Sequence, residues 1–306
     1  MIVQKASVDI SMWEPDAEFE IYPQGARSKS ATIAPDEPSD PAIRGGRRYM
    51  FKLSRASYPD QFWGEVVAYR VGCLLQVSVP PAFAAWNAAT GQCGALIEWF
   101  YEVGTERFVQ AGEFLQVLQP DFERRRGESH CTRENEVLMR ALSTRKILLG
   151  DWREWWVHAL AFDTLIGNSD RHQDNWGFIY QAQPALNKCW LAPMFDNGTS
   201  LGSELFTDRV VDWTDQRLEQ YINRGTHHVR WRLDDGSVDR KHFSLLTRAL
   251  EHWPETRSLL RDRVRAISGD ALRASLQGLT LYQLPVPFSD ARRALSFRLL
   301  SRRLER

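Results

Sequence analysis

One stretch, residues 163–202, constrains the fold more than any other part of the chain. Within it, two short apolar runs, Phe178–Tyr180 and Trp190–Ala192, flank a polar turn. Apolar strands joined by a polar turn are typical of a β-hairpin. The hairpin would leave the polar loop around Asp170 at one end of the strand pair and would return Asp196 to that loop. We therefore expect these two carboxylates to lie near one another.

The polar residues of this stretch have the types and the spacing that phosphoryl transfer needs. Asp170 and Asn175 are spaced like the Asp and Asn of the kinase loop H-R-D-x-x-x-x-N, and Asp196–Gly198 stands where kinases have D-F-G. Such a site requires a carboxylate beside the acceptor hydroxyl, and an Asn and an Asp that hold magnesium. We therefore assign Asp170 as the catalytic base, and Asn175 and Asp196 as metal ligands. A polar loop between two buried strands is the alternative, but the hairpin context favours the kinase interpretation.

A lysine and a glutamate further upstream fit the same chemistry. Tyr49–Leu53 reads as a strand that contains Lys52, and residues 60–76 have the apolar periodicity of a helix that contains Glu65. A lysine inside an apolar strand is costly unless it meets an anion. In kinases a strand Lys contacts the phosphates and a helix Glu holds that Lys. We expect Lys52 and Glu65 to form this pair; the alternative is an edge-strand lysine that reaches solvent.

Two motifs carry a family resemblance. Asn168–Asn175 and Leu191–Asp196 resemble the C-terminal lobe of HipA-like serine/threonine kinases, whose pattern is D-x-H-x-x-N followed by L-x-P-x-[YF]-D. Asp170–Asn175 is also similar to the D-R-H-x-x-N loop of phosphatidylinositol kinases, but the L-A-P-M-F-D continuation favours the HipA side. His172, two residues after the proposed base, is a further catalytic candidate that either contacts the transferring phosphate or fixes the loop. The resemblance covers residues 20–205.

The resemblance also implies a phosphate-binding loop near the N-terminus. HipA-like kinases carry a G-A-x-x-K loop, and Gly25–Lys29 fits that pattern, so its glycine and its lysine would contact the triphosphate. An ordinary turn is the alternative, because one glycine is a weak signal. The family's autophosphorylated serine lies three residues before the glycine, where this chain has Tyr22. We therefore expect any autophosphorylation to fall on Ser28 or Ser30.

The apolar run Gly94–Phe100 reads as a strand that ends in a polar and aromatic step. In a two-lobed kinase this position is the hinge, where backbone groups meet adenine. Glu98, Trp99 and Phe100 would then line the adenine slot. A core strand with an exposed end is the alternative interpretation.

Together these features predict an α+β, two-lobed protein-kinase-like fold. Residues 14–100 would form a small β-rich nucleotide-binding lobe that begins with a hairpin at 17–34. Residues 101–306 would form a larger, mainly helical lobe with the catalytic loop and the metal site, and we expect 103–126 to be irregular. Because few residues precede the first hairpin, we expect the chain to lack the additional N-terminal subdomain of HipA proper.

Composition argues against several other classes of function. Lys+Arg and Asp+Glu both number 39, so the zero net charge gives no electrostatic footprint for nucleic acid or an anionic membrane. No apolar run approaches the ~20 residues of a membrane span. The four cysteines include no C-x-x-C pair, which is typical of reduced thiols in a cytoplasmic protein. His227 and His228 are adjacent, but they have no third metal ligand at usable spacing.

These observations predict an ATP-dependent kinase that uses Mg²⁺ and transfers the γ-phosphate to a hydroxyl, in the HipA-like manner to Ser or Thr of a protein. A phosphatidylinositol-like or small-molecule kinase with the same site is one alternative. A non-catalytic, ATP-binding pseudokinase or toxin-like regulator is another. The expected partners are a protein substrate and a small regulatory protein of the toxin–antitoxin type, without direct contact to nucleic acid or membrane.

Overall fold

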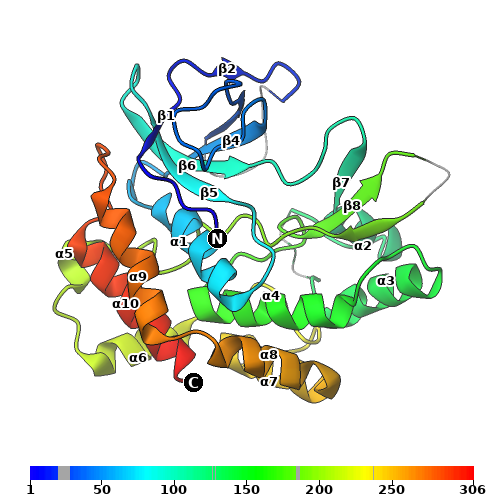
Figure 1. The fold of residues 1–306 in the computed structure, drawn as a ribbon. Helices are drawn as coiled ribbons and strands as arrows, with labels where there is room; N and C mark the ends of the chain where they lie inside the picture. Colours follow the sequence, from blue (N-terminus) through cyan, green and yellow to red (C-terminus); the bar gives the residue numbers. More distant parts are fainter. Residues whose placement is uncertain (20–27, 126, 128, 184–186, 237) are drawn as a thin grey trace. The chain divides into compact units, whose positions relative to one another are not determined.

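The structure is a computed structural model that describes residues 1–19, 28–125, 127, 129–183, 187–236 and 238–306. Internal contacts divide the chain into two compact units (Figure 1). The first unit comprises residues 1–99, 197–214 and 267–306, and the second unit comprises residues 100–196 and 215–266.

The first unit contains a six-stranded sheet. Its strands are β1 (Val8–Asp9), β2 (Glu14–Pro15), β3 (Lys29–Ile33), β4 (Arg48–Leu53), β5 (Ala82–Asn87) and β6 (Gln92–Glu98). They lie in the order β1-β5-β6-β4-β3-β2, with β1 parallel to β5 and the other neighbours antiparallel. Tyr49 and Phe51 of β4, Phe83 of β5 and Leu96 of β6 belong to its apolar core. Burial of these side chains is the main driving force for forming the sheet.

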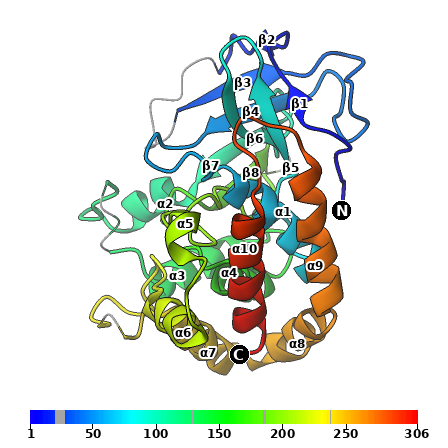
Figure 2. The same ribbon diagram turned by 90° about the vertical axis from the view of Figure 1, so that its left-hand side faces the viewer.

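Helices from three parts of the sequence complete the first unit. They are α1 (Trp63–Leu75), α5 (Thr207–Val210), α9 (Gly269–Gln277), the short 3-10 helix η2 (Gly278–Leu281) and α10 (Asp290–Leu304). Helix α1 packs against β5 and β6, and α9 packs against both α1 and α10 (Figure 2). The buried guanidinium of Arg70 on α1 donates to the Ser275 carbonyl at 2.5 Å and to the Tyr282 hydroxyl at 2.8 Å. These bonds join the C-terminal helices to α1.

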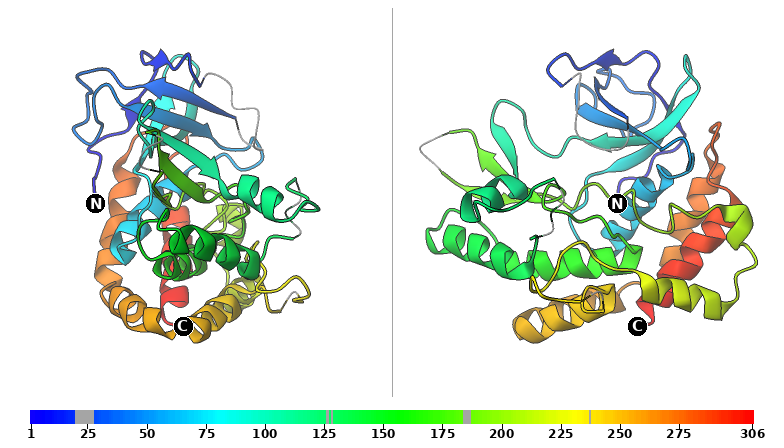
Figure 3. Two further views of the ribbon diagram at one scale, coloured as in Figure 1. Left: turned by 90° about the vertical axis from the view of Figure 1, so that its right-hand side faces the viewer. Right: turned by 180° about the vertical axis from the view of Figure 1, so that it is seen from behind.

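The second unit combines a smaller sheet with helices. Its antiparallel strands β7 (Glu106–Gln110), β8 (Gly177–Gln181) and β9 (Cys189–Leu191) follow in that order. The helices are α2 (Ala111–Leu118), α3 (Thr132–Thr144), α4 (Trp152–Ile166), α6 (Asp215–Arg224), α7 (His242–His252), η1 (Pro254–Thr256) and α8 (Arg257–Arg265). Helix α2 packs against β7, β8 and α3, and α4 packs against α7 (Figure 3).

Helix α4 leads into the predicted catalytic loop, and local signals explain where it begins and ends. The Asp151 carboxylate accepts the N–H of Arg153 and so caps the N-terminus. Gly167 ends the helix with φ 70°, a left-handed conformation that glycine adopts without strain. Most residues of α4 are buried, as its broad aromatic and aliphatic cover predicts. The polar loop therefore starts at a fixed point, directly after a rigid helix.

Several predicted elements are confirmed, and the α+β class with them. The hairpin is the β8–β9 pair, and the helix around Glu65 is α1. The prediction that residues 103–126 are irregular is wrong, because β7 and α2 form there. Strand β7 pairs with β8, which lies far away in the sequence, so no local pattern indicated it.

Two further expectations differ from the structure or lie outside it. Strand β3 pairs with Glu14–Pro15, and residues 20–27 of the predicted hairpin lie outside the described residues. Gly25 and Tyr22 lie outside the described residues. The contact grouping places residues 1–99 in the first unit, together with α5, α9 and α10, which are thus grouped with the N-terminal sheet and not with the other helices. In the described part of the chain, no helix has the length and apolar character that crossing a membrane requires.

The Arg70 contacts predict a stability effect. Arg70→Met should destabilise the protein by about 2 kcal/mol, because the buried Ser275 carbonyl loses its donor and a charge-assisted hydrogen bond disappears. Arg302→Met is the matched control in the same unit, since its side chain is 38% exposed and forms a surface ion pair with Glu305. Urea denaturation measures both variants. Equal stabilities for the two variants would contradict the structural role of Arg70.

Candidate active site

The predicted pair of Lys52 and Glu65 is present in the first unit. The Lys52 Nζ lies 2.7 Å from the Glu65 Oε1, and the two residues are only 4% and 3% exposed. Strand β4 supplies the lysine and the first turn of α1 supplies the glutamate. An ammonium buried this deeply requires a compensating charge, which Glu65 provides. The ion pair is therefore confirmed, and the edge-strand alternative is wrong.

The second carboxylate oxygen of Glu65 has a role that the sequence did not reveal. Glu65 Oε2 accepts the backbone N–H of Asn197 at 2.8 Å. The carbonyl of Asn197 in turn accepts the Ser200 hydroxyl at 2.6 Å. Asn197 directly follows Asp196, the predicted metal ligand. Glu65 thus holds Lys52 with one oxygen and the peptide after Asp196 with the other.

Lys29 lies directly opposite Lys52 in the antiparallel pair of β3 and β4. Opposed residues of two strands project from the same face of the sheet, so the two lysines share one face. Gly25, from the same predicted phosphate loop, is outside the described residues. Ser28 and Ser30 are both exposed, and autophosphorylation at either remains a prediction.

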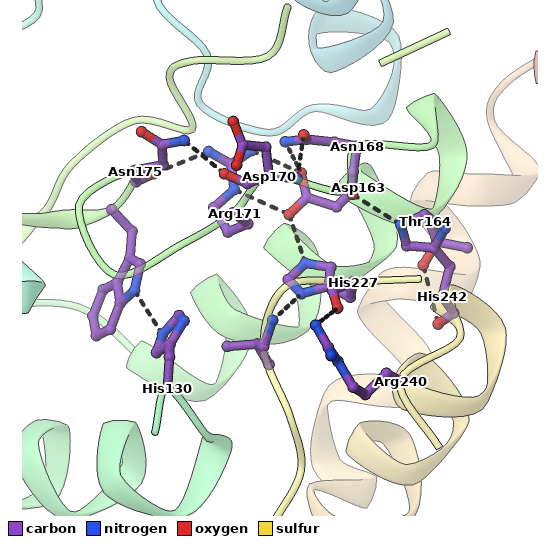
Figure 4. Close-up of polar contacts among 12 residues, drawn as sticks. His130, Asp163, Thr164, Asn168, Asp170, Arg171, Asn175, His227, Arg240 and His242 are labelled. Carbon is purple, nitrogen blue, oxygen red and sulfur yellow. Dashed lines mark hydrogen bonds and ion pairs between the residues drawn. The ribbon is translucent and has the colours of Figure 1, made fainter. Parts of the chain in front are cut away.

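The predicted catalytic loop is closed by its own hydrogen bonds (Figure 4). The Asp170 N–H donates to the Asn168 side-chain oxygen at 3.0 Å, and the Asn175 side-chain amide donates to the Asp170 carbonyl at 2.6 Å. The His172 N–H donates to the same carbonyl at 2.8 Å. Because Nδ2 of Asn175 is used in this way, Oδ1 is the atom of that amide that a metal would contact. Backbone geometry therefore orients Asn175 independently of any ligand.

Arg171 and Asp163 form a fully buried, bidentate pair beneath this loop. Arg171 Nε lies 3.0 Å from Asp163 Oδ2, and Arg171 Nη2 lies 2.7 Å from Asp163 Oδ1. The remaining nitrogen, Nη1, donates to the carbonyls of Asn175 at 3.1 Å and Phe195 at 2.5 Å. Burial by itself would raise the pKa of Asp163, but Arg171 and a hydrogen bond from His227 hold the pKa of that carboxyl well below its usual range. Arg171 thereby connects the loop to the residue before Asp196.

His227 completes the partners of Asp163. Its Nε2 lies 2.9 Å from Asp163 Oδ2, and its Nδ1 accepts the Val229 N–H at 3.1 Å. Since Nδ1 acts as an acceptor, the proton of a neutral ring resides on Nε2 and is donated to Asp163. From the sequence, His227 was considered only as a metal ligand, and no third ligand accompanied it and His228. The signal available in the sequence was Asp163, an acidic residue within the apolar cover of α4, because a buried charge requires partners.

Asp196 has an unusual backbone conformation. Its φ is 55°, in the left-handed region, which Asp tolerates better than most residues. The peptide groups on both sides of it are held, since Arg171 binds the Phe195 carbonyl and Glu65 binds the Asn197 N–H. Residues fixed in sparsely populated conformations cluster at functional sites. The return of this segment to the loop, which the predicted hairpin implied, is confirmed by the bond between Arg171 and Phe195.

His172 takes part in the loop through one ring nitrogen. Its Nδ1 accepts the Asp174 N–H at 3.1 Å, and its ring lies 5.8 Å from that of His228. This bond is what the loop-fixing role of His172 predicts. Asp174 in turn pairs with Arg124 at 2.9 Å. The contact with a transferring phosphate stays a prediction.

The three predicted hinge residues have partners within their own units. The Glu98 N–H donates to the Pro81 carbonyl at 2.8 Å, and the Trp99 N–H donates to the Arg48 carbonyl at 3.0 Å. In the second unit, Phe100 stacks on Phe195 with ring centroids 5.0 Å apart. The role of Glu98, Trp99 and Phe100 in lining the adenine slot remains a prediction. Any adenine contact by the first two would have to use atoms other than these N–H groups.

The predicted metal ligands suit Mg²⁺ by donor chemistry. Asn175 offers an amide oxygen and Asp196 a carboxylate, and Mg²⁺ prefers oxygen donors. In the described residues, no group of three or more His, Cys, Asp or Glu side chains is arranged to hold a metal ion. Mg²⁺ usually binds through one or two protein ligands together with substrate phosphates and water.

The Asp163 network predicts an acid-dependent loss of stability. Because the pKa of Asp163 is lowered on folding, its contribution is present above the usual carboxyl pKa of about 3.9 and is lost as the pH falls through the folded value. At neutral pH, Asp163→Asn should destabilise the protein by about 3–5 kcal/mol, since Arg171 then remains buried without its counter-charge. Below about pH 4 the difference from the wild type should shrink. Asp262→Asn, with a side chain 68% exposed, is the control. Urea denaturation across pH measures this, and a pH-independent difference would contradict it.

The chain is similar to one family of known proteins and to solved structures. The model of the HipA-like C-terminal domain family matches residues 21–264. The crystal structure of the proinflammatory kinase CtkA of Helicobacter pylori is similar, with a TM-score of 0.68 and 15% identity, over 97% of this chain and 93% of that chain. No curated protein sequence matches significantly.

A second solved structure extends the fold comparison. HipA of Shewanella oneidensis MR-1, solved with HipB and its operator DNA, matches with a TM-score of 0.51 and 13% identity, over 95% of this chain and 66% of that chain. At these identities the two structures show the fold, which is the predicted two-lobed kinase-like α+β fold. The family match covers most of the sequence, including the catalytic-loop and Asp196 motifs. The chain therefore belongs to the HipA-like C-terminal domain family.

Proposed function

We propose that the protein is an ATP- and Mg²⁺-dependent kinase that transfers the γ-phosphate to Ser or Thr of a protein substrate. The observation that carries this proposal is the bonding of Glu65, which holds both Lys52 and the peptide after Asp196. In phosphoryl transfer, the Lys and the metal-binding Asp act on neighbouring phosphate oxygens. A single carboxylate that fixes both groups suits that chemistry. Membership of the HipA-like family supports the same conclusion.

In this proposal the lysines bind the nucleotide phosphates. Lys52 contacts the α- and β-phosphates, and Glu65 prevents its ammonium from changing position. Lys29, on the same sheet face, contacts the triphosphate together with Gly25. The opposed register of the two lysines supports this assignment, because both side chains project from the same sheet face.

The remaining groups act on the metal and the acceptor. Asn175 and Asp196 hold Mg²⁺, which when bound neutralises charge on the phosphate oxygens. Asp170 orients the acceptor hydroxyl and accepts its proton as the new O–P bond forms. His172 fixes the loop through its bond to the Asp174 N–H. Arg171 keeps the backbone at Asn175 and Phe195 in place, so the ligand-bearing segments need little reorganisation.

The partner in this proposal is a protein. HipA of Shewanella oneidensis was solved with HipB and operator DNA, and by analogy we include a small regulatory protein as a partner of this chain. Direct binding of nucleic acid is left out, because a chain with zero net charge offers no general attraction for phosphate backbones. Incubation of the purified protein with γ-labelled ATP, Mg²⁺, and either a host lysate or phosphoinositide vesicles distinguishes protein from lipid acceptors. Label in the vesicles alone would overturn the assignment of a protein substrate.

Substitutions of Asp170 and Asp196 should impair different steps of the reaction. Asp170→Asn should leave affinity for Mg²⁺–ATP within a few-fold and slow phosphoryl transfer by roughly 10²–10⁴-fold, the usual scale for a positioned acid or base. Asp196→Ala should weaken metal–nucleotide binding as well as transfer, because the metal bridges the phosphates. Calorimetry and single-turnover transfer measure the two effects, with thermal melts to exclude unfolding. The opposite pattern would reverse the two roles.

Lys52 and Glu65 should behave as one unit in ATP use. Lys52→Met and Glu65→Gln should each lower kcat/KM for ATP by roughly 10²-fold, since the first change removes the positive charge from the phosphates and the second removes the carboxylate that holds that charge in place. The double variant should be little worse than either single one, because interacting residues are not additive. Lys5→Met, at an exposed position of the same unit, serves as the control. Full additivity of the two losses would show that the residues act independently.

A further inference from the structure

The histidine beside Asp163 comes from a remote segment that the proposed function does not use. His227 is 1% exposed and belongs to residues 225–230, which we call the strap, between α6 and α7. Figure 4 shows His227 below Asp163, and Asp170 and Asn175 lie above and to the left of His227 in that view. Its imidazole donates to Asp163 but is not bonded to Asp170 or Asn175 in any contact described above.

The strap is held on both sides, so the direction of the His227 ring is fixed. The His227 N–H donates to the Arg240 carbonyl at 2.7 Å. Arg240 Nη2 returns bonds to the carbonyls of His227 at 3.2 Å and His228 at 3.3 Å. At the far end, the Arg230 N–H donates to the His130 carbonyl at 3.1 Å. The strap therefore presents a rigid donor to Asp163.

The Asp163 carboxylate transmits this constraint because its hydrogen-bonding capacity is filled. Its Oδ1 accepts from Arg171 Nη2 and from the Asn168 amide at 3.0 Å. Its Oδ2 accepts from Arg171 Nε and from His227. With four donors the carboxylate has one orientation, and so has the guanidinium bound to it. Loss of the His227 bond would leave Oδ2 with Arg171 Nε as its one remaining donor in this network and so weaken the restraint on the carboxylate and on Arg171.

Arg171 is the link between this network and the predicted metal ligands. Its Nη1 binds the carbonyl of Asn175 and the carbonyl of Phe195, the residue before Asp196. A shift of the guanidinium would therefore displace the backbone of both ligand-bearing segments at once. Hydrogen-bond partners that orient metal ligands in this indirect way change metal affinity or activity by about 10–100-fold when they are removed.

We propose that His227 is a positioning residue for the metal ligands Asn175 and Asp196, acting through Asp163 and Arg171. The inference rests on the proposed function and adds a requirement that the strap be in place for metal binding. A purely structural role for His227 predicts something else. It predicts lower stability with unchanged metal affinity in the folded protein.

The test measures metal binding without turnover. Mn²⁺ is titrated into the full chain with the β,γ-imido analogue of ATP, and free Mn²⁺ is followed by electron paramagnetic resonance. His227→Ala should weaken Mn²⁺ binding by about 10–100-fold. His227→Gln should stay within a few-fold of wild type, because its amide can donate to Asp163 Oδ2. His252→Ala should not differ, since that exposed histidine pairs with Glu136 at 3.1 Å on the surface of the same unit.

The outcomes separate the two proposals. If the wild-type protein and His252→Ala bind no Mn²⁺ with the analogue, the proposed function fails and this inference fails with it. If both bind, Asp196→Ala does not, and His227→Ala binds like wild type below its melting temperature, only the role of His227 is refuted. Equal loss in His227→Gln and His227→Ala would also refute it, because the donor to Asp163 would then be irrelevant.

A second variant covers the case in which His227→Ala does not fold. Arg240→Met removes only the bonds that hold the strap carbonyls, at a half-buried position, and leaves the His227 side chain intact. It should weaken Mn²⁺ binding by several-fold and raise the Mg²⁺ concentration needed for half-maximal transfer, with the KM for the acceptor unchanged. Wild-type Mn²⁺ affinity in folded Arg240→Met would overturn the proposal.

Discussion

The predicted catalytic loop depends on one buried contact, the pair of Asp163 and Arg171. Both side chains are removed from water, and an isolated charge at either position would be strongly destabilising. The pair is tolerated because the carboxylate is fully hydrogen-bonded and because the guanidinium also donates to backbone carbonyls. Because these hydrogen bonds can form together in only one arrangement, the pair fixes the geometry of the loop more than it adds to the stability of the protein. Its value is therefore the precise placement of the segments that carry Asn175 and Asp196.

The first unit uses a carboxylate in a comparable way. Glu65 gives one oxygen to the Lys52 ammonium and the other to the Asn197 N–H. Asp163 likewise binds a cation and a further donor, here a histidine. In both cases an acidic residue on a helix is neutralised by a cation and restrains a segment that leads to or from Asp196. Electrostatic catalysis benefits from such preorganised groups, because they need not rearrange during the reaction.

Much of the fold and part of the site were predictable from short-range patterns. The β8–β9 hairpin follows from two apolar runs around a polar turn, and α4 begins and ends at an Asp cap and a Gly. The Lys52–Glu65 pair was predictable because a buried strand lysine requires an anion and a helix glutamate follows it. Strand β7 and helix α2 were not predicted, since β7 is stabilised by its pairing with distant β8. The grouping of the C-terminal helices with α1 depends on Arg70, whose partners no spacing rule identifies.

By itself, the sequence determined the type and order of the predicted reactive groups. Asp170, Asn175 and Asp196 stand at spacings that phosphoryl transfer requires, and these depend only on covalent connectivity and local turns. The tertiary structure decided what holds them. His227 is assigned to Asp163 by packing between the strap and α4, and Glu65 reaches Asn197 across a long sequence separation. Such contacts depend on which buried charges can be satisfied together, and that is settled only when the whole chain is folded.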